Sequence, residues 1–260
     1  MIDLHCHILP GLDDGPGDLE ASVEMARVAV ENGIETTVAT PHVSLDYPTA
    51  PDDMSRAVGT LNLALVRRGI PLAVLPGAEL APSRLVDTDD ATLAQLALAG
   101  GRTVLVESPY VPGMPWLEDL LFDLQARGFK PVLAHPERSP LFQQDPARLA
   151  RVVQRGVCCS ITAASLAGRF GSRVKHFSLR LVSEGLVHDI ASDAHDHERR
   201  LPSLLDAFAA AEAEIPGISE HADWFTRVAP EALLAGKVLP APPALAMSKG
   251  PVWKRFARRR

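Results

Sequence analysis

Short apolar runs recur along the chain, and longer stretches of helical character separate them. The runs are rich in β-branched residues and bounded by Gly or Pro, which is typical of strands buried on both faces of a parallel sheet. In chain order they span residues 1–4, 34–39, 72–77, 103–106, 131–134, 157–161 and 186–192. We therefore expect about seven short strands that run in the same direction.

Helix boundary signals lie in the stretches between these runs. Residues 51–69 and 145–156 both open with Pro and Asp and close with Arg followed by Gly, which favours a helix start and a helix stop. The stretches 18–33 and 116–128 also end at Gly. Strand–helix alternation predicts βαβ units, and a chain of 260 residues suits one (β/α) barrel of ~250 residues better than two domains. We predict one α/β barrel domain over residues 1–240.

Histidine and carboxylate side chains follow the predicted strands. His5 and His7 close the first run, and alternate residues of a strand point the same way, so both imidazoles should face one point. Every later run except 157–161 also leads to such side chains, namely His42, Glu79, Glu107, His135, Asp193 and His195. In (β/α) barrels the chemistry lies at the carboxyl ends of the strands, where these side chains would meet. Mixed imidazole and carboxylate ligation suits borderline divalent metals.

Composition narrows the class of protein. Hydrophobic residues make up 47% of the chain, enough for a core, and no apolar stretch approaches the ~20 residues of a membrane span. The N-terminal residues lack the basic and apolar regions of a secretory signal, and three cysteines, two of them adjacent, cannot form a disulfide framework. These features favour a reducing cytoplasm. The net charge of −6 argues against a nucleic-acid partner.

The C-terminal end differs from the rest in composition. After the Pro-rich residues 240–243 come the cations Lys249, Lys254, Arg255, Arg258, Arg259 and Arg260. We predict a basic, flexible tail over residues 241–260. Such a tail is most often only a solvated end, and the alternative is peripheral contact with an anionic membrane surface or a membrane-bound partner.

The motifs at the strand ends resemble those of the PHP (polymerase and histidinol phosphatase) superfamily. Within it they are most similar to the bacterial capsule- and exopolysaccharide-associated protein-tyrosine phosphatases. The segments that carry the resemblance span nearly the whole chain, in the family's order: 5–15 (HCHILPGLDDG), 39–42 (ATPH), 75–79 (LPGAE), 134–138 (AHPER), 165–171 (SLAGRFG) and 191–195 (ASDAH).

The resemblance implies a distorted (β/α)7 TIM-like barrel with three divalent metal ions, Mn²⁺ in the first place and Fe²⁺ or Zn²⁺ as alternatives. The implied ligand sets are His5, His7, Glu79 and Asp193 for one ion, Glu79, Glu107 and His135 for the second, and Asp14, His42 and His195 for the third. Glu79 would bridge two ions, which lie ~3.5–4 Å apart in such sites. Asp13 is an alternative to Asp14, because loop geometry decides between them and the pair also suits a turn.

Two arginines, Arg138 and Arg200, are the expected phosphate contacts, since a guanidinium fork matches phosphate oxygens. They follow predicted metal ligands after three and five residues, and the resemblance points to both positions. The alternative role for them is a surface ion pair with Glu137 or Glu198.

These residues predict a metal-dependent phosphomonoesterase. Metal ions lower the pKa of bound water from 15.7 to ~7, so we expect hydrolysis by a metal-activated hydroxide. A thiolate phosphatase needs a cysteine with an arginine six residues later, and no cysteine of this chain has one. The thiolate mechanism is therefore excluded.

The resemblance implies phosphotyrosine on a protein as the substrate, on the tail of a membrane tyrosine kinase that controls polysaccharide export. It also implies a cytoplasmic location, at the inner face of the membrane. The first alternative is a small-molecule phosphatase of the same superfamily, of the histidinol-phosphate type. The second is a metal-binding protein without turnover, which is disfavoured because all ligand positions and both arginine positions are filled.

Overall fold

The computed structural model describes residues 1–248, and the cations of the predicted tail, Lys249 to Arg260, lie outside this range. Within it the strands pair with one another only in parallel. The strands are β1 (Ile2–Cys6), β2 (Thr36–Ala39), β3 (His42–Val43), β4 (Ala73–Pro76), β5 (Glu79–Leu80), β6 (Thr103–Glu107), β7 (Lys130–Ala134), β8 (Cys158–Thr162) and β9 (Asp189–Ala191). Each apolar run that the sequence predicted as a strand overlaps one of them.

Two strand positions are interrupted. β2 gives way to β3 at Pro41, which has no N–H to donate to a sheet ladder. β4 gives way to β5 at Gly77, where a Cβ atom would lie 2.8 Å from the Val38 side chain on the neighbouring strand. These interruptions divide the ladder into one sheet of β1, β2 and β4 and a second of β3, β5, β6, β7, β8 and β9.

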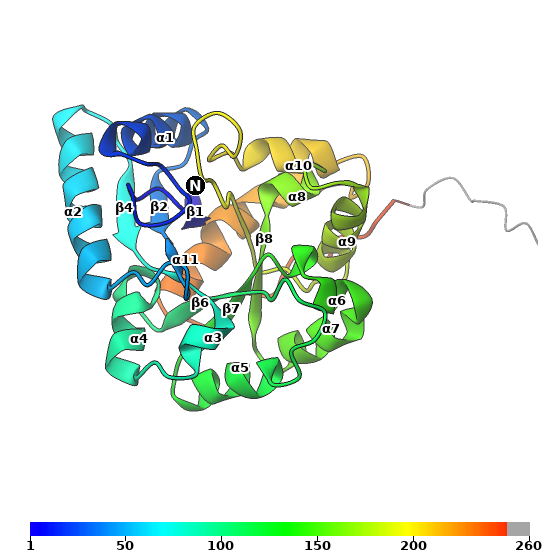
Figure 1. Cartoon of the computed structure of the whole chain (residues 1–260). Helices are drawn as coiled ribbons and strands as arrows, with labels where there is room; N and C mark the ends of the chain where they lie inside the picture. Colours follow the sequence, from blue (N-terminus) through cyan, green and yellow to red (C-terminus); the bar gives the residue numbers. More distant parts are fainter. Residues whose placement is uncertain (249–260) are drawn as a thin grey trace, which may run out of the picture.

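The strands nevertheless follow one another around a ring (Figure 1). A parallel bridge joins Cys6, at the end of β1, to Ala194, just beyond β9. Beside it the Ala194 carbonyl accepts a hydrogen bond of 2.8 Å from the His7 amide. Counting β2 with β3 and β4 with β5 leaves seven strand positions between these closing contacts. The distorted (β/α)7 barrel predicted from the sequence is confirmed.

Helices surround this ring (Figure 1). Those predicted over residues 18–33, 51–69, 116–128 and 145–156 are confirmed as α1, α2, α5 and α7. The α-helices are α1 (Leu19–Glu31), α2 (Pro51–Arg67), α3 (Pro82–Leu85), α4 (Asp90–Leu96), α5 (Leu117–Ala126), α6 (Pro140–Gln144), α7 (Pro146–Gln154), α8 (Ala163–Leu166), α9 (Ser172–Ser183), α10 (Leu205–Ala211) and α11 (Ala229–Leu234). Shorter turns are η1 (Leu98–Gly100), η2 (Pro136–Arg138), η3 (Ser219–His221) and the π-helical η4 (Trp224–Val228).

The apolar side chains form two separate cores. The larger one packs the strands against the surrounding helices. The smaller one takes side chains from β1, β2, β6, β7 and β8, together with Leu98 and Leu233. The Thr103 hydroxyl, at the start of β6, donates a hydrogen bond of 2.6 Å to the Leu233 carbonyl of α11. Helix α11 therefore closes the end of the barrel where the strands begin, and the other end stays free for polar side chains.

Two further expectations concern the cysteines and possible membrane-spanning segments. Cys158 and Cys159 lie in β8 as buried free thiols, and burial raises the pKa of each. Among residues 1–248, no helix combines the length and the apolar character that crossing a bilayer requires.

A buried carboxyl group inside the barrel makes a testable contribution to stability. Burial raises the pKa of Asp189 to about 8, and its second oxygen accepts a hydrogen bond from the Ser160 hydroxyl. Since an aspartate in the unfolded chain ionises near pH 4, ionisation favours unfolding as the pH rises toward 8. Between pH 5 and 8 this group should cost the metal-free protein up to ~4 kcal/mol of unfolding free energy.

Asp189→Asn should remove that loss, so the unfolding free energy of the variant relative to the parent should rise between pH 5 and pH 8. Chemical denaturation of the metal-free protein at both pH values measures it. Asp87→Asn, at an exposed position, is the control and should show no such trend. An identical pH dependence for the parent and Asp189→Asn would contradict the argument.

Candidate metal centre

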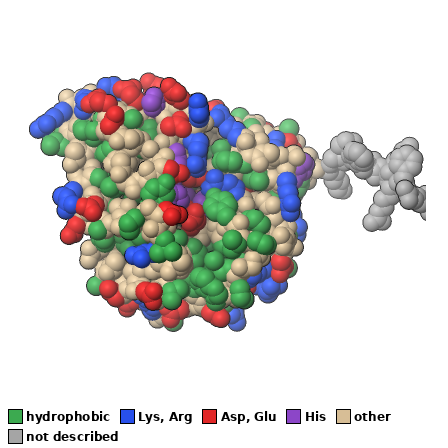
Figure 2. All heavy atoms as spheres, viewed as in Figure 1, with side chains coloured by type: hydrophobic (Ala, Val, Ile, Leu, Met, Phe, Trp, Pro, Cys, Tyr) green, Lys and Arg blue, Asp and Glu red, His purple; other side chains and the backbone are tan. Residues whose placement is uncertain are grey.

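The predicted metal ligands lie together at the carboxyl ends of the strands. Figure 2 shows histidine, acidic and arginine side chains gathered in a hollow on this face of the barrel. Each side chain comes from the end of a strand or from the loop that follows it, in parallel register around the ring. The residues brought together are His5, His7, Asp14, His42, Glu79, Glu107, His135, Asp193 and His195.

Glu79 lies at the centre of this cluster and is fully buried. Its Oε1 atom is 2.7 Å from His135 Nε2, whereas Oε2 is 3.1 Å from His42 Nδ1, 3.4 Å from His5 Nε2 and 3.5 Å from His7 Nε2. Burial acts to raise the pKa of Glu79, but the neighbouring His5 and His135 outweigh it and hold the pKa well below its usual value. The two oxygens of one carboxylate thus face different groups of imidazoles, as a bridging ligand requires.

His5, His7 and Asp193 converge on one point. The Nε2 atoms of the two histidines are 3.1 Å apart, and Asp193 Oδ1 is 3.5 Å from each. All three side chains are at most 2% exposed. Two imidazole nitrogens and a carboxylate oxygen aimed at the same buried point form a donor set that suits a divalent cation.

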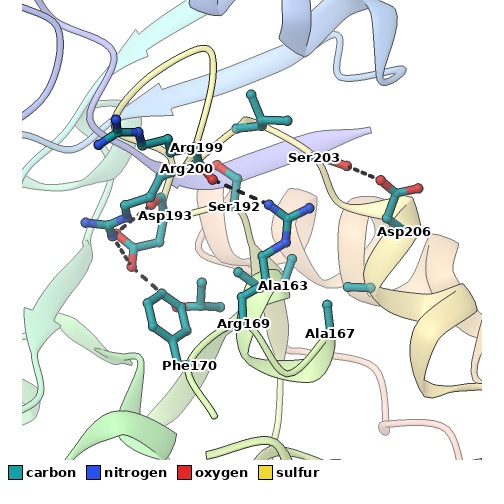
Figure 3. A pocket seen from close by; sticks show the side chains of 14 residues that line it. Ala163, Ala167, Arg169, Phe170, Ser192, Asp193, Arg199, Arg200, Ser203 and Asp206 are labelled. Atoms are coloured by element: carbon teal, nitrogen blue, oxygen red, sulfur yellow. Dashed lines mark hydrogen bonds and ion pairs between the residues drawn. The ribbon is translucent and has the colours of Figure 1, made fainter.

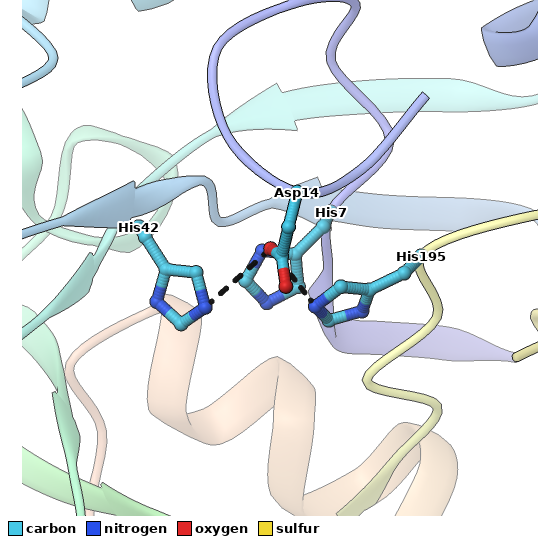
Figure 4. Close-up of side chains that lie close together, drawn as sticks. All are labelled: His7, Asp14, His42 and His195. Carbon is cyan, nitrogen blue, oxygen red and sulfur yellow. Dashed lines mark ion pairs between the residues drawn. The ribbon is translucent and has the colours of Figure 1, made fainter. Parts of the chain in front are cut away.

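A second convergence joins the loop after β1 to the strand ends on either side of β1 (Figure 4). Asp14 Oδ1 is 3.3 Å from His195 Nε2 and 3.7 Å from His42 Nε2, and His7 belongs to the same group. The hydrogen bond from His195 lowers the pKa of Asp14, although burial opposes the shift. The Nδ1 atom of His195 is 3.1 Å from the Asp193 carbonyl, which leaves Nε2 facing Asp14.

Asp13 contacts the Nδ1 side of the His7 ring and serves another purpose. Its Oδ2 atom is 2.6 Å from His7 Nδ1 and accepts a hydrogen bond of 2.9 Å from the His42 amide. Burial acts to raise the pKa of Asp13, but the contact with His7 lowers it by more, so the pKa lies below its usual value. Asp13 therefore orients the His7 ring, and Asp14 is the aspartate that faces the candidate metal position.

Gly15 allows this loop to approach β1 closely. A Cβ atom at this position would lie 2.3 Å from the His7 carbonyl oxygen. The Gly15 amide also donates a hydrogen bond of 3.0 Å to Asp13 Oδ1. A glycine here brings both aspartates against the first strand.

Glu107 lies at the edge of the cluster, in a group with Glu79 and His42. Burial and the negative charge of Glu79 raise the pKa of Glu107 to about 7. His135 was expected beside it, and the structure gives His135 a direct contact with Glu79. Burial and the charge of Arg138 lower the pKa of His135 to about 4, so its imidazole is neutral and free to bind a cation at neutral pH.

The two predicted arginines both reach Asp193. Arg138 Nη2 is 2.8 Å and Arg200 Nη2 is 2.9 Å from Asp193 Oδ2, and Arg200 also donates to the Asp193 carbonyl at 3.0 Å. Oδ1 of this aspartate faces the histidines and Oδ2 faces the arginines. In the described part of the chain, Arg138 forms no ion pair with Glu137, and Arg200 forms none with Glu198. Glu137 instead accepts a hydrogen bond from the Thr162 amide, and Glu198 lies beside His197.

Backbone strain accompanies this arrangement. His135 has φ 37° and Asp193 has φ 51°, values that side-chain-bearing residues adopt rarely. The strand end before Asp193 is held by Asp3, which accepts hydrogen bonds from both the amide and the hydroxyl of Ser192. The Ser192 hydroxyl oxygen in turn accepts from the Ala194 amide at 3.1 Å. This hydrogen-bonded turn maintains the unusual backbone that directs Asp193 and His195 inward.

Two hollows meet at Asp193 and Arg200. The first, the metal cleft, has a volume of about 180 Å³ and is lined by the candidate ligands other than His5 and His7, together with Tyr110, Arg138 and Arg200. The second has a volume of about 200 Å³ and is lined by four alanines, Leu201 and Phe170 together with three hydroxyl side chains, two aspartates and three arginines (Figure 3). The Arg169 guanidinium spans it and donates to the Arg199 carbonyl at 3.4 Å.

Sequence reasoning missed several residues of this site. Asp3 carried a recognisable signal, since a carboxylate inside a short apolar strand has to find a partner. The roles of Asp13, Tyr110 and Phe170 had no comparable signal, because each depends on which neighbour the folded loop approaches.

Comparison with known proteins places this site in a family. The family model for capsular polysaccharide synthesis, CpsB/CapC, matches residues 1–223. The chain belongs to the CpsB/CapC family. Among its relatives, the tyrosine-protein phosphatase YwqE of Bacillus subtilis is 43% identical over 215 residues, which cover 82% of this chain and 85% of YwqE. The tyrosine-protein phosphatase CpsB of Streptococcus pneumoniae is 26% identical over 220 residues, covering 80% of this chain and 88% of CpsB.

Solved structures agree with this membership. A chain from the crystal structures of YwqE and CpsB, which are described as metal-dependent tyrosine phosphatases, superposes with a TM-score of 0.83 at 38% identity. The match covers 96% of this chain and 100% of that one. A 5-methylcytosine deaminase of Klebsiella pneumoniae has a TM-score of 0.51 at 14% identity over 88% of this chain and 68% of its own, which shows likeness of fold alone.

The neighbouring aspartates provide a matched test of the CpsB/CapC site in this chain. Asp14→Asn removes an oxygen that faces His42 and His195, so the Mn²⁺-loaded variant should lose about one equivalent of bound metal. Asp13→Asn only loosens the orientation of His7, and it should keep the metal count while weakening affinity by roughly 10- to 100-fold. Elemental analysis after gel filtration measures the metal content of both variants. The reverse pattern would mean that Asp13 is the ligand.

Proposed function

We propose that this chain is a metal-dependent phosphatase that hydrolyses phosphotyrosine on proteins. The observation that carries the proposal is the contact of Arg138 and Arg200 with the outer oxygen of Asp193, at the edge of a buried histidine and carboxylate cluster. Two guanidinium groups beside a cation site are suited to a phosphate dianion. The YwqE and CpsB relatives, named as tyrosine phosphatases, support the same substrate class.

Three divalent ions, Mn²⁺ in the first place, would occupy the cluster. His5, His7, Glu79 and Asp193 would hold the first, Glu79, Glu107 and His135 the second, and Asp14, His42 and His195 the third. The donor set supports this assignment, because Glu79 is buried, its Oε2 atom accepts no hydrogen bond from the described residues, and its two oxygens face different imidazoles. Bound there, divalent ions would neutralise phosphoryl oxygens and acidify water.

The protein's own residues bind and orient the substrate. Arg138 is 11% exposed at its side chain and holds a fixed position on Asp193, so its fork is already in place before phosphate arrives. Arg200 is 35% exposed and approaches from the opposite loop. Phosphate oxygens would accept hydrogen bonds from the guanidinium N–H groups that now face Asp193 Oδ2, while Asp193 Oδ1 stays beside the histidines. Buried walls on the inner side limit access of bulk water.

The partner that fits this function is a phosphotyrosine segment of a tyrosine kinase in the membrane, and the cytoplasm is the compartment where the two would meet. The CpsB/CapC family, described by its role in capsular polysaccharide synthesis, supports that pairing. Residues 1–240 would form the catalytic domain. A basic tail over residues 241–260 could add attraction to an anionic membrane surface.

Substrate preference tests the proposed function directly. With Mn²⁺ the protein should hydrolyse a phosphotyrosine peptide faster than histidinol phosphate or the matching phosphoserine peptide. A chelator should abolish turnover, and Mn²⁺ should restore it. Steady-state kcat/KM values for the three substrates give the comparison. A preference for histidinol phosphate would favour the small-molecule phosphatase, and turnover by fully demetallated protein would contradict the metal mechanism.

Replacing Arg138 should separate phosphate binding from folding. Arg138→Met keeps an unbranched apolar stem but removes the fork, so kcat/KM for the phosphotyrosine peptide should fall roughly 10²- to 10³-fold, as when one oxyanion donor is lost. Arg138→Lys should restore only part of the lost kcat/KM, because a point charge cannot replace the guanidinium fork. Kinetics with parallel elemental analysis provide the measurement.

Arg148→Met is the matched control. Arg148 is 14% exposed at its side chain and paired with Glu118, away from the cleft, so the variant loses a similar ion pair. It should keep the parent's kcat/KM per folded molecule. If Arg138→Met binds its metals and turns over at the parent rate, Arg138 has no part in binding phosphate.

A further inference from the structure

Two partly exposed aromatic rings flank the phosphate-facing arginine. The Arg138 Cζ atom lies 4.9 Å from the ring centre of Phe170 and 5.9 Å from that of Tyr110. Phe170 is 37% exposed and Tyr110 is 54% exposed. Among the described residues that line the metal cleft, Tyr110 is the one that is not a histidine, a carboxylate or an arginine, and Phe170 lines the adjoining second cavity. The two rings therefore provide apolar surface beside Arg138.

The Phe170 ring is held by a tight turn. Gly168 and Gly171, on either side of it, have φ 85° and 93°, which residues with a Cβ atom rarely adopt. The Gly171 amide donates to the Gly168 carbonyl at 3.0 Å, and the Arg169 amide donates to the Ala164 carbonyl at 3.0 Å. The ring lines the second cavity and also contacts Arg138, so it stands between that cavity and the metal cleft.

The Tyr110 ring is held by contacts of its own. It stacks on the His135 imidazole with ring centres 5.6 Å apart and planes 28° from parallel. The backbone just before it is fixed by the buried Ser139 hydroxyl, which donates to the Pro109 carbonyl at 2.6 Å. Ser139 directly follows Arg138, so the loop with Tyr110 and the turn with Arg138 are tied together.

The geometry determines where a phosphate ester would point its organic group. The inner side of the cleft is filled by Glu79, His5, His7 and His135, all buried. A phosphate bound at Arg138 therefore has to turn its ester oxygen toward the open side. The group attached to that oxygen then meets Tyr110 and Phe170 first.

We propose that Tyr110 and Phe170 form an aryl slot that makes the site select aryl over alkyl phosphate esters. This inference rests on the proposed function and names the side chains that give it its substrate class. A flat ring bound beside Arg138 gains stacking or edge contacts with these two fixed rings, whereas a short alkyl chain does not. Such contacts correspond to roughly 2- to 12-fold in affinity for each ring.

Binding of two phosphonates to the Mn²⁺-loaded protein tests the slot without any turnover. Benzylphosphonate mimics an aryl ester and propylphosphonate an alkyl ester, and both carry the same charged head group. Calorimetry should show the parent favouring benzylphosphonate. Phe170→Leu and Tyr110→Leu should each reduce that preference by roughly 2- to 12-fold, mainly through weaker benzylphosphonate binding, and Phe170→Tyr should retain it.

Phe122→Leu is the matched control, because Arg155 lies 4.6 Å from the Phe122 ring centre and neither residue lines the cleft or the second cavity. The control should keep the parent's preference. If Phe170→Leu weakens both phosphonates equally, the ring only positions Arg138 and the slot is refuted. A loss of preference in Tyr47→Leu alone would also refute it, since Tyr47 stacks on His42, another candidate ligand.

Failure of the slot and failure of the proposed function give different results. A parent protein that hydrolyses phosphotyrosine peptide but shows the same phosphonate preference as its Phe170→Leu and Tyr110→Leu variants would retain the phosphatase function and lose the slot. A parent that discriminates between the phosphonates but hydrolyses no phosphate ester would lose the phosphatase function instead.

Discussion

The crowding of buried carboxylates and imidazoles around Glu79 is the constraint on which the rest of this site depends. Parallel strands end at one rim of the barrel, so every polar residue placed at a strand end is brought to the same small volume. Buried charges are costly unless they are paired. Glu79 meets this condition by facing four imidazoles with its two oxygens, and the same division suits it to bridge cations.

A second layer of contacts holds these side chains in position. Asp13 fixes the His7 ring, and the Asp193 carbonyl fixes His195. Asp3 and Ser192 support the left-handed backbone at Asp193. The cost of that backbone is offset by hydrogen bonds around it, which is the usual pattern at functional sites. Loss of such a contact would shift a candidate metal-binding side chain without removing it from the site.

In the proposed function, the open side of the same cluster would recognise the substrate. Asp193 connects the two parts, because one oxygen faces histidines and the other holds both arginines. The loop of Tyr110 is tied to the Arg138 turn through the Ser139 hydroxyl, and the Phe170 ring lies against the Arg138 guanidinium. In the proposed function, cation binding, phosphate binding and choice of organic group would therefore depend on neighbouring segments rather than on separate parts of the fold.

The sequence by itself determined the barrel and the site's location. Short apolar runs ending in His, Asp or Glu predict parallel strands whose carboxyl ends meet, because strand direction and residue alternation are local properties. Only the tertiary structure placed Asp14, and not Asp13, against the imidazoles of His42 and His195, and brought both Tyr110 and Phe170 beside Arg138. Adjacent residues in a loop can exchange roles with a small change of backbone dihedrals, and side chains from distant loops meet only when packing fixes both. Local pattern thus specifies which strand end carries a candidate ligand, and long-range packing decides which atom it faces.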